Sequence, residues 1–365
     1  MTPNARQAAW REIKHDLQTC APSDIRHKHP DSHGIVTAAA GAELLVNAWI
    51  MIARLRHVGC ALPVQVFHGE TERVPAAIRQ AFDAQTTFIA IADEGVAGYA
   101  YKPLALERSS FDACLWLDAD NTPLVDPSPL FDIATDALAW PDAFRFNRAV
   151  VYDVFDELST DAPEIEAGQL LIRTRACADV LGAVVRLNRE HRAIAWSDML
   201  GDKDTFRVAF HARRRDLTIV SQTPTVVGTL GRALRPQRDS SGRFQLIATH
   251  YHENALIQHG PDGRALFLHR TGSPWSLSAR FRPLTWSFPL EAPIREHIGD
   301  WSPHAVQPVD PRALEADAWC ARKFDQVAWF YEACGMPGWQ LALRRALCKR
   351  RVAQRYVYPE SKFGA

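Results

Sequence analysis

Two acidic residues one position apart, Asp118 and Asp120, directly follow an apolar run in this 365-residue chain. The run, Cys114-Leu-Trp-Leu117, has the length and composition of a buried strand. In open α/β sheets ligands bind at the carboxyl ends of the strands, so both carboxylates are expected at the lip of a cleft. Carboxylate oxygens suit a hard divalent cation, which in turn binds phosphate oxygens. The segment therefore predicts a site for a metal ion and a phosphorylated substrate.

The same segment also fits a second chemistry, in which the first aspartate is a nucleophile. Residues 118–122 match the D-x-D-x-T pattern of haloacid dehalogenase phosphatases. Those enzymes resemble one another in a later acidic pair, G-D-x-x-x-D, but here Gly201-Asp202 is followed at that place by Phe206. They also usually carry the nucleophile on an early strand, whereas three strands are expected before Asp118. The phosphatase therefore stays the second interpretation.

The elements that must position these acids alternate between short apolar runs and helical periodicity from residue 34 to about 123, which is typical of a parallel sheet flanked by helices. Strands are expected at 35–37, 64–67, 87–91 and 114–117, with helices at 44–55 and 74–82 and one that Pro103 opens. Later strands are expected at 169–172, 217–220, 244–248 and 265–268, and helices at 176–189, after 201–204, at 311–333 and at 338–356, with an irregular stretch at 282–311. The sequence thus predicts an α/β fold with a mostly parallel central sheet and a helical C-terminal extension.

Composition argues against several classes of function. The chain has 42 Lys plus Arg and 42 Asp plus Glu, so no overall charge favours a nucleic acid as partner. Its seven cysteines are scattered without a C-x-x-C pair, which favours reduced thiols and a cytoplasmic location. No apolar leader opens the sequence, and no stretch approaches the roughly 18 apolar residues of a membrane span, so neither secretion nor a spanning helix is expected.

Seven short motifs, taken in order, resemble the mannosyltransferase family typified by fungal α-1,3-mannosyltransferases: Tyr101-Lys102-Pro103, Ser109-Ser110-Phe111, Leu117-Asp-Ala-Asp-Asn-Thr-Pro123, Asp126-Pro127, Trp140-Pro141-Asp142, Glu166-Ala-Gly168-Gln169 and Gly201-Asp-Lys-Asp-Thr-Phe206. The match runs from about Gly34 to Trp275. It implies a GT-A fold and transfer of a hexose from a sugar nucleotide, typically GDP-mannose, with manganese or magnesium and with retention of anomeric configuration. The acceptor would be a glycan or a lipid-linked sugar. Fungal members are Golgi proteins with an N-terminal anchor, which this chain is expected to lack, so its biological setting would differ.

Two alternatives to transfer from GDP-mannose stay open beside the phosphatase. The donor could be a UDP-hexose. The chain could also bind a nucleotide sugar without transferring it, because Thr271 and Pro274 stand where the family pattern Phe-x-His-Arg-Asn-x-x-Lys-Trp has Asn and Lys. A phosphate contact would then be missing, or Arg270 would supply it.

The resemblance implies a metal site with three protein ligands. Asp118 and Asp120 would bind the metal and the diphosphate, and Asn121 would hold the turn or touch the ribose. His269 ends the apolar run 265–268, as the third metal ligand does in related retaining GT-A enzymes. An imidazole suits manganese better than magnesium.

The resemblance also implies contacts with the donor and the transferred sugar. Gly168 would let the backbone approach the donor sugar, and Gln169 would present its amide near the anomeric carbon. Asp204 would contact the sugar or the incoming acceptor, while Asp202 would hold the loop, so Asp204, Gln169 and Asp202 form the predicted catalytic set. The remaining predicted donor contacts are Thr37, Ala38, Lys102 and Lys203.

The chain is expected to divide into an N-terminal extension (1–33), a GT-A catalytic domain (34–280) and an irregular and helical C-terminal region (281–365) packed on that domain. Residues 341–355 form a basic amphipathic pattern that could touch anionic lipid at the inner face of a membrane. A solvated helix face packed on the core is the alternative for this segment.

Overall fold

The computed structural model describes residues 2–92, 100–144, 149–155, 164–199, 201–238, 244–271, 274–277, 283–294 and 305–341. The strands are β1 (His29–Ala38), β2 (Val64–Gly69), β3 (Thr86–Ile91), β4 (Phe111–Leu117), β5 (Asn121–Pro123), β6 (Ala137–Pro141), β7 (Ile165–Arg173), β8 (Thr218–Ile219), β9 (Thr225–Arg238), β10 (Phe244–His259), β11 (Ala265–His269) and β12 (Trp286–Pro289). The helices are α1 (Pro3–Thr19), α2 (Gly41–His57), α3 (Ala76–Gln80), α4 (Tyr101–Arg108), α5 (Ala149–Val154), α6 (Ala178–Arg189), α7 (Arg192–Asp198), α8 (Lys203–Ala212), α9 (Pro311–Phe324) and α10 (Ala328–Ala333), with a short 3-10 turn at Ser128–Asp132.

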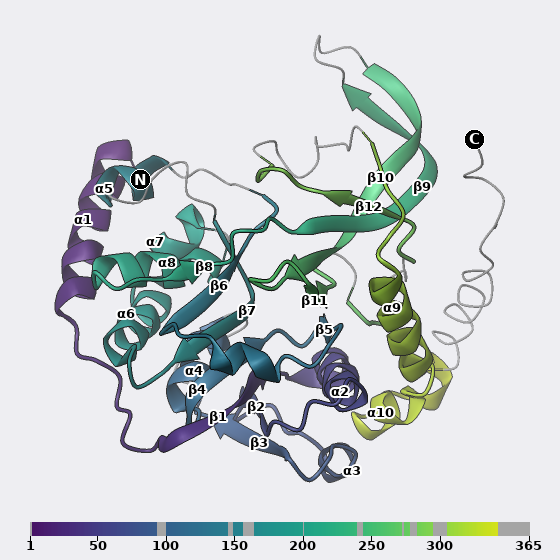
Figure 1. The fold of residues 1–365 in the computed structure, drawn as a ribbon, viewed down its shortest axis with the longest axis horizontal. Helices are drawn as coiled ribbons and strands as arrows, with labels where there is room; N and C mark the ends of the chain where they lie inside the picture. The colour runs from purple at the N-terminus through teal and green to yellow at the C-terminus, as the bar shows by residue number, and fades with distance from the viewer. Residues whose placement is uncertain are drawn as a thin grey trace.

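Two sheets share the chain (Figure 1). The larger has the strand order β3-β2-β1-β4-β7-β6-β8, and in it β7 pairs antiparallel with both of its neighbours while the other described pairs are parallel. The smaller sheet is antiparallel, in the order β12-β9-β10-β11-β5. This confirms the predicted α/β fold with a mostly parallel central sheet, the arrangement expected of the GT-A type.

Helices cover both faces of the larger sheet, which explains why its strands are nearly continuous apolar runs. In β4, Cys114 and Trp116 belong to the core formed with α1, α4, α6 and α8. The alternate residues Leu115 and Leu117 belong to the core formed with α2, α3, α9 and α10. Figure 1 shows α1, α6 and α8 on one side of this sheet and α2, α9 and α10 on the other. Because β4 is covered on both faces, its charged continuation at Asp118 has to emerge at the strand end.

A long hairpin of β9 and β10 extends away from the rest of the smaller sheet (Figure 1). The sequence predicts only 244–248 of this hairpin as strand, and β9 is not predicted at all. Two glycines, Gly228 and Gly231, and Pro236 interrupt the β9 pattern, and such residues are typical of loops or bulges when read alone. Pairing along the whole length of β10 overrides that local preference.

The N-terminal extension is part of the core, because α1 buries Trp10, Ile13 and Leu17 completely or almost completely. Thr2 caps this helix by accepting a hydrogen bond from the Ala5 N–H at 3.3 Å, and Pro3 occupies its first turn. The predictions did not include α1. The structure also starts β1 at His29, upstream of the predicted boundary at residue 34.

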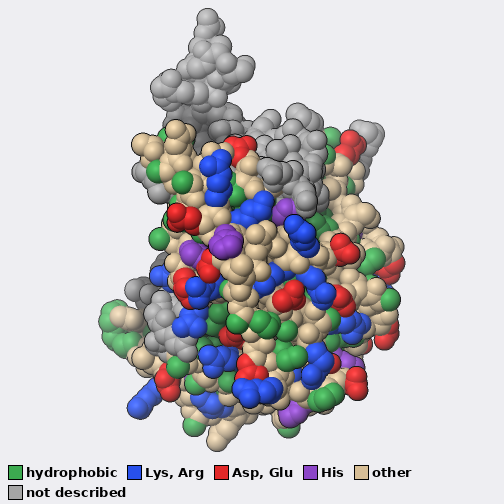
Figure 2. Space-filling view, turned by 90° about the vertical axis from the view of Figure 1, so that its left-hand side faces the viewer, with side chains coloured by type: hydrophobic (Ala, Val, Ile, Leu, Met, Phe, Trp, Pro, Cys, Tyr) green, Lys and Arg blue, Asp and Glu red, His purple; other side chains and the backbone are tan. Residues whose placement is uncertain are grey.

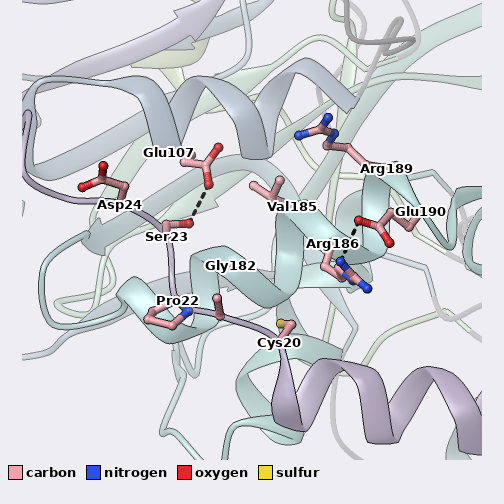
Figure 3. Close-up of a pocket in the computed structure, with 11 residues that line it drawn as sticks. Cys20, Pro22, Ser23, Asp24, Glu107, Gly182, Val185, Arg186, Arg189 and Glu190 are labelled. Atoms are coloured by element: carbon pink, nitrogen blue, oxygen red, sulfur yellow. Dashed lines mark hydrogen bonds and ion pairs between the residues drawn. The ribbon is translucent and has the colours of Figure 1, made fainter.

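The segment after α1 lies against α6 and α4 and borders a surface hollow of about 210 Å³ (Figure 3). It passes Gly182, where a Cβ atom would come within 2.3 Å of the Ala21 carbonyl oxygen, so the close approach requires glycine. Ser23 donates a hydrogen bond to Glu107 at 2.8 Å. Glu107 precedes the start of β4 whereas Asp118 follows its end, so this hollow is separate from the predicted site.

The C-terminal region contributes one strand to the smaller sheet and two helices to the core. The stretch expected to be irregular contains β12, which pairs with β9, and α9 packs on α2 and β5. The predicted helix at 311–333 is two helices, α9 and α10, and a further turn is helical at 338–341. The rest of the predicted helix at 338–356, including the basic segment after Leu341, lies outside the described residues.

Charged side chains are interspersed on the face shown in Figure 2, where acidic and basic groups alternate over short distances. The equal numbers of acids and bases are therefore also mixed locally on this face. No helix among the described residues is both long and apolar enough to cross a bilayer. The six cysteines in the described part of the chain are all free thiols.

Candidate active site

The two acids lie in the turn that carries the chain from one sheet to the other. The Asp118 N–H donates to the Gly168 carbonyl at 2.8 Å, as the last step of the β4–β7 pairing, and the Asn121 N–H donates back to the Asp118 carbonyl at 2.9 Å. Trp116 donates its indole N–H to Asp118 Oδ1 at 2.7 Å. Beyond this turn β5 joins the smaller sheet. The sequence placed these carboxylates correctly at the end of a buried central strand.

Pairing of β5 with β11 brings His269 to the acids, because its register sets His269 opposite Asn121. The imidazole Nε2 lies 3.2 Å from Asp120 Oδ1 and 3.8 Å from Asp118 Oδ2. One ligand atom from each of Asp118, Asp120 and His269 lies within 4.8 Å of the other two. Two carboxylates and an imidazole form a donor set that suits Mn²⁺, so the three predicted metal ligands converge as expected and fit the ion.

Glu166 holds the other side of the imidazole, and the sequence prediction did not include it as a site residue. Its Oε2 lies 3.1 Å from His269 Nδ1. Burial opposes charge on His269, but Glu166 and Asp120 outweigh burial and raise its pKa well above 6.5. Burial likewise opposes charge on Glu166, but His269, Lys102 and the Gly168 N–H lower the pKa of this carboxyl to about 2. In the metal-free protein these two groups therefore form a buried ion pair.

Gly168 lies against the imidazole, and the side chain of the neighbouring Gln169 is buried. A Cβ atom on Gly168 would lie 2.2 Å from His269 Cε1 and 2.3 Å from Nδ1, so the ring fills the space that glycine leaves. The Gln169 amide is fully buried, donates to Glu166 Oε2 at 3.1 Å and accepts from Asn121 Nδ2 at 2.7 Å. Its predicted place beside an anomeric carbon stays a prediction.

Lys102 joins the acids to the loop before α8. Its ammonium lies 3.3 Å from Asp118 Oδ1 and 3.1 Å from Asp202 Oδ2, and it donates to the Ala167 carbonyl at 2.7 Å. Burial opposes the charge on Lys102, but Asp118 and Asp202 outweigh it and raise the pKa of the ammonium above its usual value. Burial raises the pKa of both carboxyls. Of the two predicted loop acids, Asp202 is thus the one that the structure links to the metal candidates.

Lys203 and Asp204 belong to a neighbouring buried charge cluster. Lys203 Nζ pairs with Asp142 and, at 3.0 Å, with Glu164, both of which the prediction omitted as site residues. Asp204 lies 3.3 Å from Arg207 Nε and 3.9 Å from Lys203 Nζ. Burial opposes the charge on Lys203, but Asp142 and the other acids outweigh it and raise its pKa. These internal pairs do not test the predicted donor contact of Lys203 or the predicted contact of Asp204 with the sugar or the acceptor.

The residues predicted to bind the nucleotide lie at the end of β1, beside β4. Thr37 is fully buried, and within the described part of the chain its Oγ1 has no hydrogen-bond partner. Ala38 is half-buried. Asn121 Oδ1 is likewise buried without a partner among the described residues, although its amide nitrogen is bonded to Gly168 and Gln169. Two polar atoms near the strand ends can therefore still accept hydrogen bonds.

Arg270, which was expected to supply a phosphate contact if one is missing, is engaged with the C-terminal region. Its side chain is fully buried and forms an ion pair with Asp317 of α9, while its guanidinium lies 4.7 Å from the centre of the Trp275 ring. Its backbone N–H donates to the Asp120 carbonyl at 3.2 Å. Arg270 therefore ties the metal-site turn to the C-terminal region, and Thr271 and Pro274 are exposed.

This fold and site define an α/β protein with two aspartates and a histidine gathered at the end of a central strand. Residues 32–164 match the family described as "Mannosyltransferase putative". The resemblance to a mannosyltransferase family is therefore confirmed, over a region that contains Lys102, Asp118 and Asp120. His269 and the loop before α8 lie beyond the matched residues.

The curated relatives that the chain resembles are also named mannosyltransferases. The chain is 31% identical to α-1,2-mannosyltransferase MNN2 of Saccharomyces cerevisiae over 138 residues, which are 33% of this chain and 23% of the relative. It is 23% identical to α-1,2-mannosyltransferase MNN23 of Candida albicans over 300 residues, 65% of this chain and 48% of the relative. The chain thus spans less than half the length of these relatives. Their names give an α-1,2 linkage rather than the α-1,3 linkage of the type member.

The chain also has a structural likeness to solved glycosyltransferases. The galactosyltransferase LgtC in complex with donor and acceptor sugar analogues has a TM-score of 0.36 and 17% identity, with 48% of this chain and 70% of that chain covered. The glycosyltransferase GlyE of Streptococcus pneumoniae has a TM-score of 0.38 and 12% identity, with coverages of 52% and 46%. The likeness to both is partial.

Proposed function

We propose that this protein is a metal-dependent retaining glycosyltransferase that transfers a hexose, with mannose from GDP-mannose as the favoured donor, to a glycan or lipid-linked acceptor. One observation carries the proposal. Asp118 and Asp120, in the turn between the two sheets, meet His269 of the smaller sheet within 4.8 Å at the end of a central strand, in a chain whose residues 32–164 match a mannosyltransferase family. The names of the curated relatives support mannose as the transferred sugar.

Asp118, Asp120 and His269 would hold a Mn²⁺ or Mg²⁺ ion, which when bound supplies a Lewis acid that neutralises the leaving diphosphate. The chain's own groups do the rest of the positioning. Lys102 holds Asp118 and Asp202 together, and through this pair Asp202 would hold the loop before α8 beside the metal site. Thr37 and Asn121 each have a buried oxygen without a hydrogen-bond partner among the described residues, and these oxygens would accept hydrogen bonds from the nucleotide sugar. The catalytic roles of Gln169 and Asp204 remain proposals.

A nucleotide-sugar-binding protein without transfer is the second candidate. The observation that favours it is the lack of a cationic contact where the family pattern has Lys: Pro274 stands there, and the Arg270 guanidinium is buried against Asp317. A retained donor site with a weakened diphosphate contact would bind but turn over slowly. A UDP-hexose as donor remains open in either case.

A donor panel tests the proposal and its alternatives together. GDP-mannose, UDP-glucose and UDP-galactose are offered with Mn²⁺, and free nucleotide release is measured beside calorimetric binding. Mn²⁺-dependent turnover of GDP-mannose, lost in Asp120→Asn, is the expected result. Binding without turnover of any donor would favour a nucleotide-sugar-binding protein without transfer. Turnover of a UDP-sugar alone would change the assigned donor from GDP-mannose to that sugar. Release of inorganic phosphate from phosphorylated sugars, without nucleotide release from any donor, would favour the phosphatase.

A further inference from the structure

One oxygen of Glu166 collects three contacts in the site. Its Oε2 accepts from the Gly168 N–H at 3.0 Å and from Gln169 Nε2 at 3.1 Å, and it lies 3.1 Å from His269 Nδ1. The Gly168 N–H and the Gln169 amide nitrogen can only donate to this oxygen, and an ionised carboxylate offers acceptors only. The imidazole must therefore carry a hydrogen on Nδ1.

A hydrogen on Nδ1 decides what the other ring nitrogen can do. Nε2 points away from Glu166 and lies 3.2 Å from Asp120 Oδ1. With the hydrogen on Nδ1, the Nε2 of a neutral imidazole presents a lone pair on the side of the ring that faces both aspartates. A carboxylate that binds the far nitrogen of a ligating histidine in this way fixes the tautomer and the ring orientation.

Space as well as hydrogen bonding fixes the ring. Gly168 is two residues from Glu166 on β7, and the imidazole occupies the volume that any Cβ atom there would need, with contacts as short as 2.2 Å. Glu166 and Gly168 therefore form one seat for the ring: Glu166 binds Nδ1, and Gly168 leaves the space that the ring occupies. The seat lies in β7, whereas the histidine comes from β11, 103 residues further along the chain.

We propose that Glu166 is a positioning residue that, with the space left by Gly168, holds His269 as the Nδ1–H tautomer and directs Nε2 to a divalent cation shared with Asp118 and Asp120. This inference rests on the metal site of the proposed function. It does not rest on the donor or on transfer, since it concerns only how the histidine is held.

The test measures Mn²⁺ affinity of the full chain by calorimetry, without any sugar nucleotide. Glu166→Gln keeps the size of the side chain but removes its charge and one acceptor oxygen, and it is expected to weaken Mn²⁺ binding about 10-fold or more. Asp16→Asn is the matched control, because Asp16 also pairs with a histidine, His191, at 2.7 Å, but between α1 and the start of α7. The control is expected to leave Mn²⁺ affinity unchanged. No loss of affinity in Glu166→Gln, at unchanged thermal stability, would overturn the inference.

A double-mutant cycle separates positioning from simple charge removal. If Glu166 acts through the imidazole, Glu166→Gln should have almost no further effect on Mn²⁺ affinity once His269→Ala is present. If it acts only as a nearby negative charge, the fold-change should be the same in both backgrounds, and the positioning role would be wrong. Thermal unfolding of each variant shows whether the fold is retained.

Gly168→Ala gives a second, independent test should Glu166→Gln fail to fold. The new methyl group must displace the His269 ring, so Mn²⁺ affinity should fall to the level of His269→Ala. In the His269→Ala background only the flexible Glu166 carboxylate, whose Oε2 would lie 2.8 Å from the new Cβ atom, has to shift, and no further loss of Mn²⁺ affinity is expected. Wild-type affinity in Gly168→Ala would contradict the proposed seat.

The outcomes also separate this inference from the proposed function. If Glu166→Gln weakens Mn²⁺ binding only while His269 is present, and no donor is turned over, the positioning role of Glu166 would stand and sugar transfer would be refuted. Turnover of GDP-mannose with no measurable Mn²⁺ binding to the wild-type chain would refute the seat and leave transfer standing.

Discussion

Lys102 gives the sharpest test of the electrostatics of this site. Its ammonium bridges Asp118 and Asp202 at 3.3 and 3.1 Å, and the Lys102 and Asp202 side chains are only 5% and 6% exposed. Lys102→Met keeps most of the aliphatic volume but leaves the Asp202 carboxylate buried without its cation. Removing one partner of a buried ion pair costs about 3–5 kcal/mol, whereas an exposed pair contributes under about 1 kcal/mol. The variant should therefore lose about 3–5 kcal/mol of its free energy of unfolding.

The assay is urea unfolding without metal, followed by the fluorescence of the chain's 11 tryptophans. Lys102→Met/Asp202→Asn removes the orphaned charge and should recover at least half of the loss. Lys14→Met is the matched control: Lys14 also donates to a carbonyl, of Val154 at 2.8 Å, and lies 5.2 Å from the centre of an aromatic ring, but it is half-exposed. Its loss should stay within about 1 kcal/mol, the usual range for a surface substitution.

The pH dependence has a definite sign. Burial already raises the pKa of Asp202, and without Lys102 the pKa must rise further. Between the unfolded value of about 3.9 and the raised folded value, the folded variant binds a proton that the unfolded chain does not. The deficit of Lys102→Met should therefore shrink as pH falls. A loss under about 1 kcal/mol at pH 7.5, or a double variant no more stable than the single one, would refute the reasoning.

Three further outcomes are expected. Asp16→Asn should lower the free energy of unfolding by about 1 kcal/mol or less, because the ion pairs of Asp16 with Arg186 and His191 are partly exposed. Hydrogen bonds from Arg186 lower the pKa of Asp16. Urea midpoints should therefore show this contribution at pH 7 and its loss as pH falls below about 4. Asp317→Ala removes the carboxylate that faces the fully buried Arg270 and should cost about 3–5 kcal/mol in the same assay, and a loss under about 1 kcal/mol would show the pair to be dispensable. Chelation by EDTA should abolish nucleotide release and added Mn²⁺ should restore it, whereas equal rates in both buffers would contradict metal dependence.

The sequence was sufficient where one local signal determined the structure. The run 114–117 followed by Asp118 could only be a buried strand that ends in charge, and β4 ends at Leu117. The apolar run 265–268 likewise predicted the strand β11, which ends at His269. Parallel strands covered on both faces have this unbroken apolar character, so their positions can be predicted without knowing their partners.

Contacts between side chains far apart in the sequence could not be predicted from the sequence. Glu166 belongs to one of the seven motifs of the mannosyltransferase resemblance, but nothing local shows that an imidazole 103 residues away will contact it. Its one signal was an acid two residues before a glycine at the start of a strand. Asp142 was missed as a site residue for the same reason, because its partner Lys203 lies 61 residues away on α8.

The charges that meet at the site explain why a divalent cation suits it. Four carboxylates, those of Asp118, Asp120, Glu166 and Asp202, surround two cations, Lys102 and the protonated His269. The excess is negative and partly buried, and burial raises the pKa of Asp118 and Asp202 accordingly. Asp118, Asp120 and His269 would hold a divalent cation there, and its binding in place of the Nε2 proton would add one net positive charge. The seat in β7 keeps the histidine in place through that exchange, so Glu166 serves the metal-free protein as a counter-ion and the metal-bound protein as the support of a ligand.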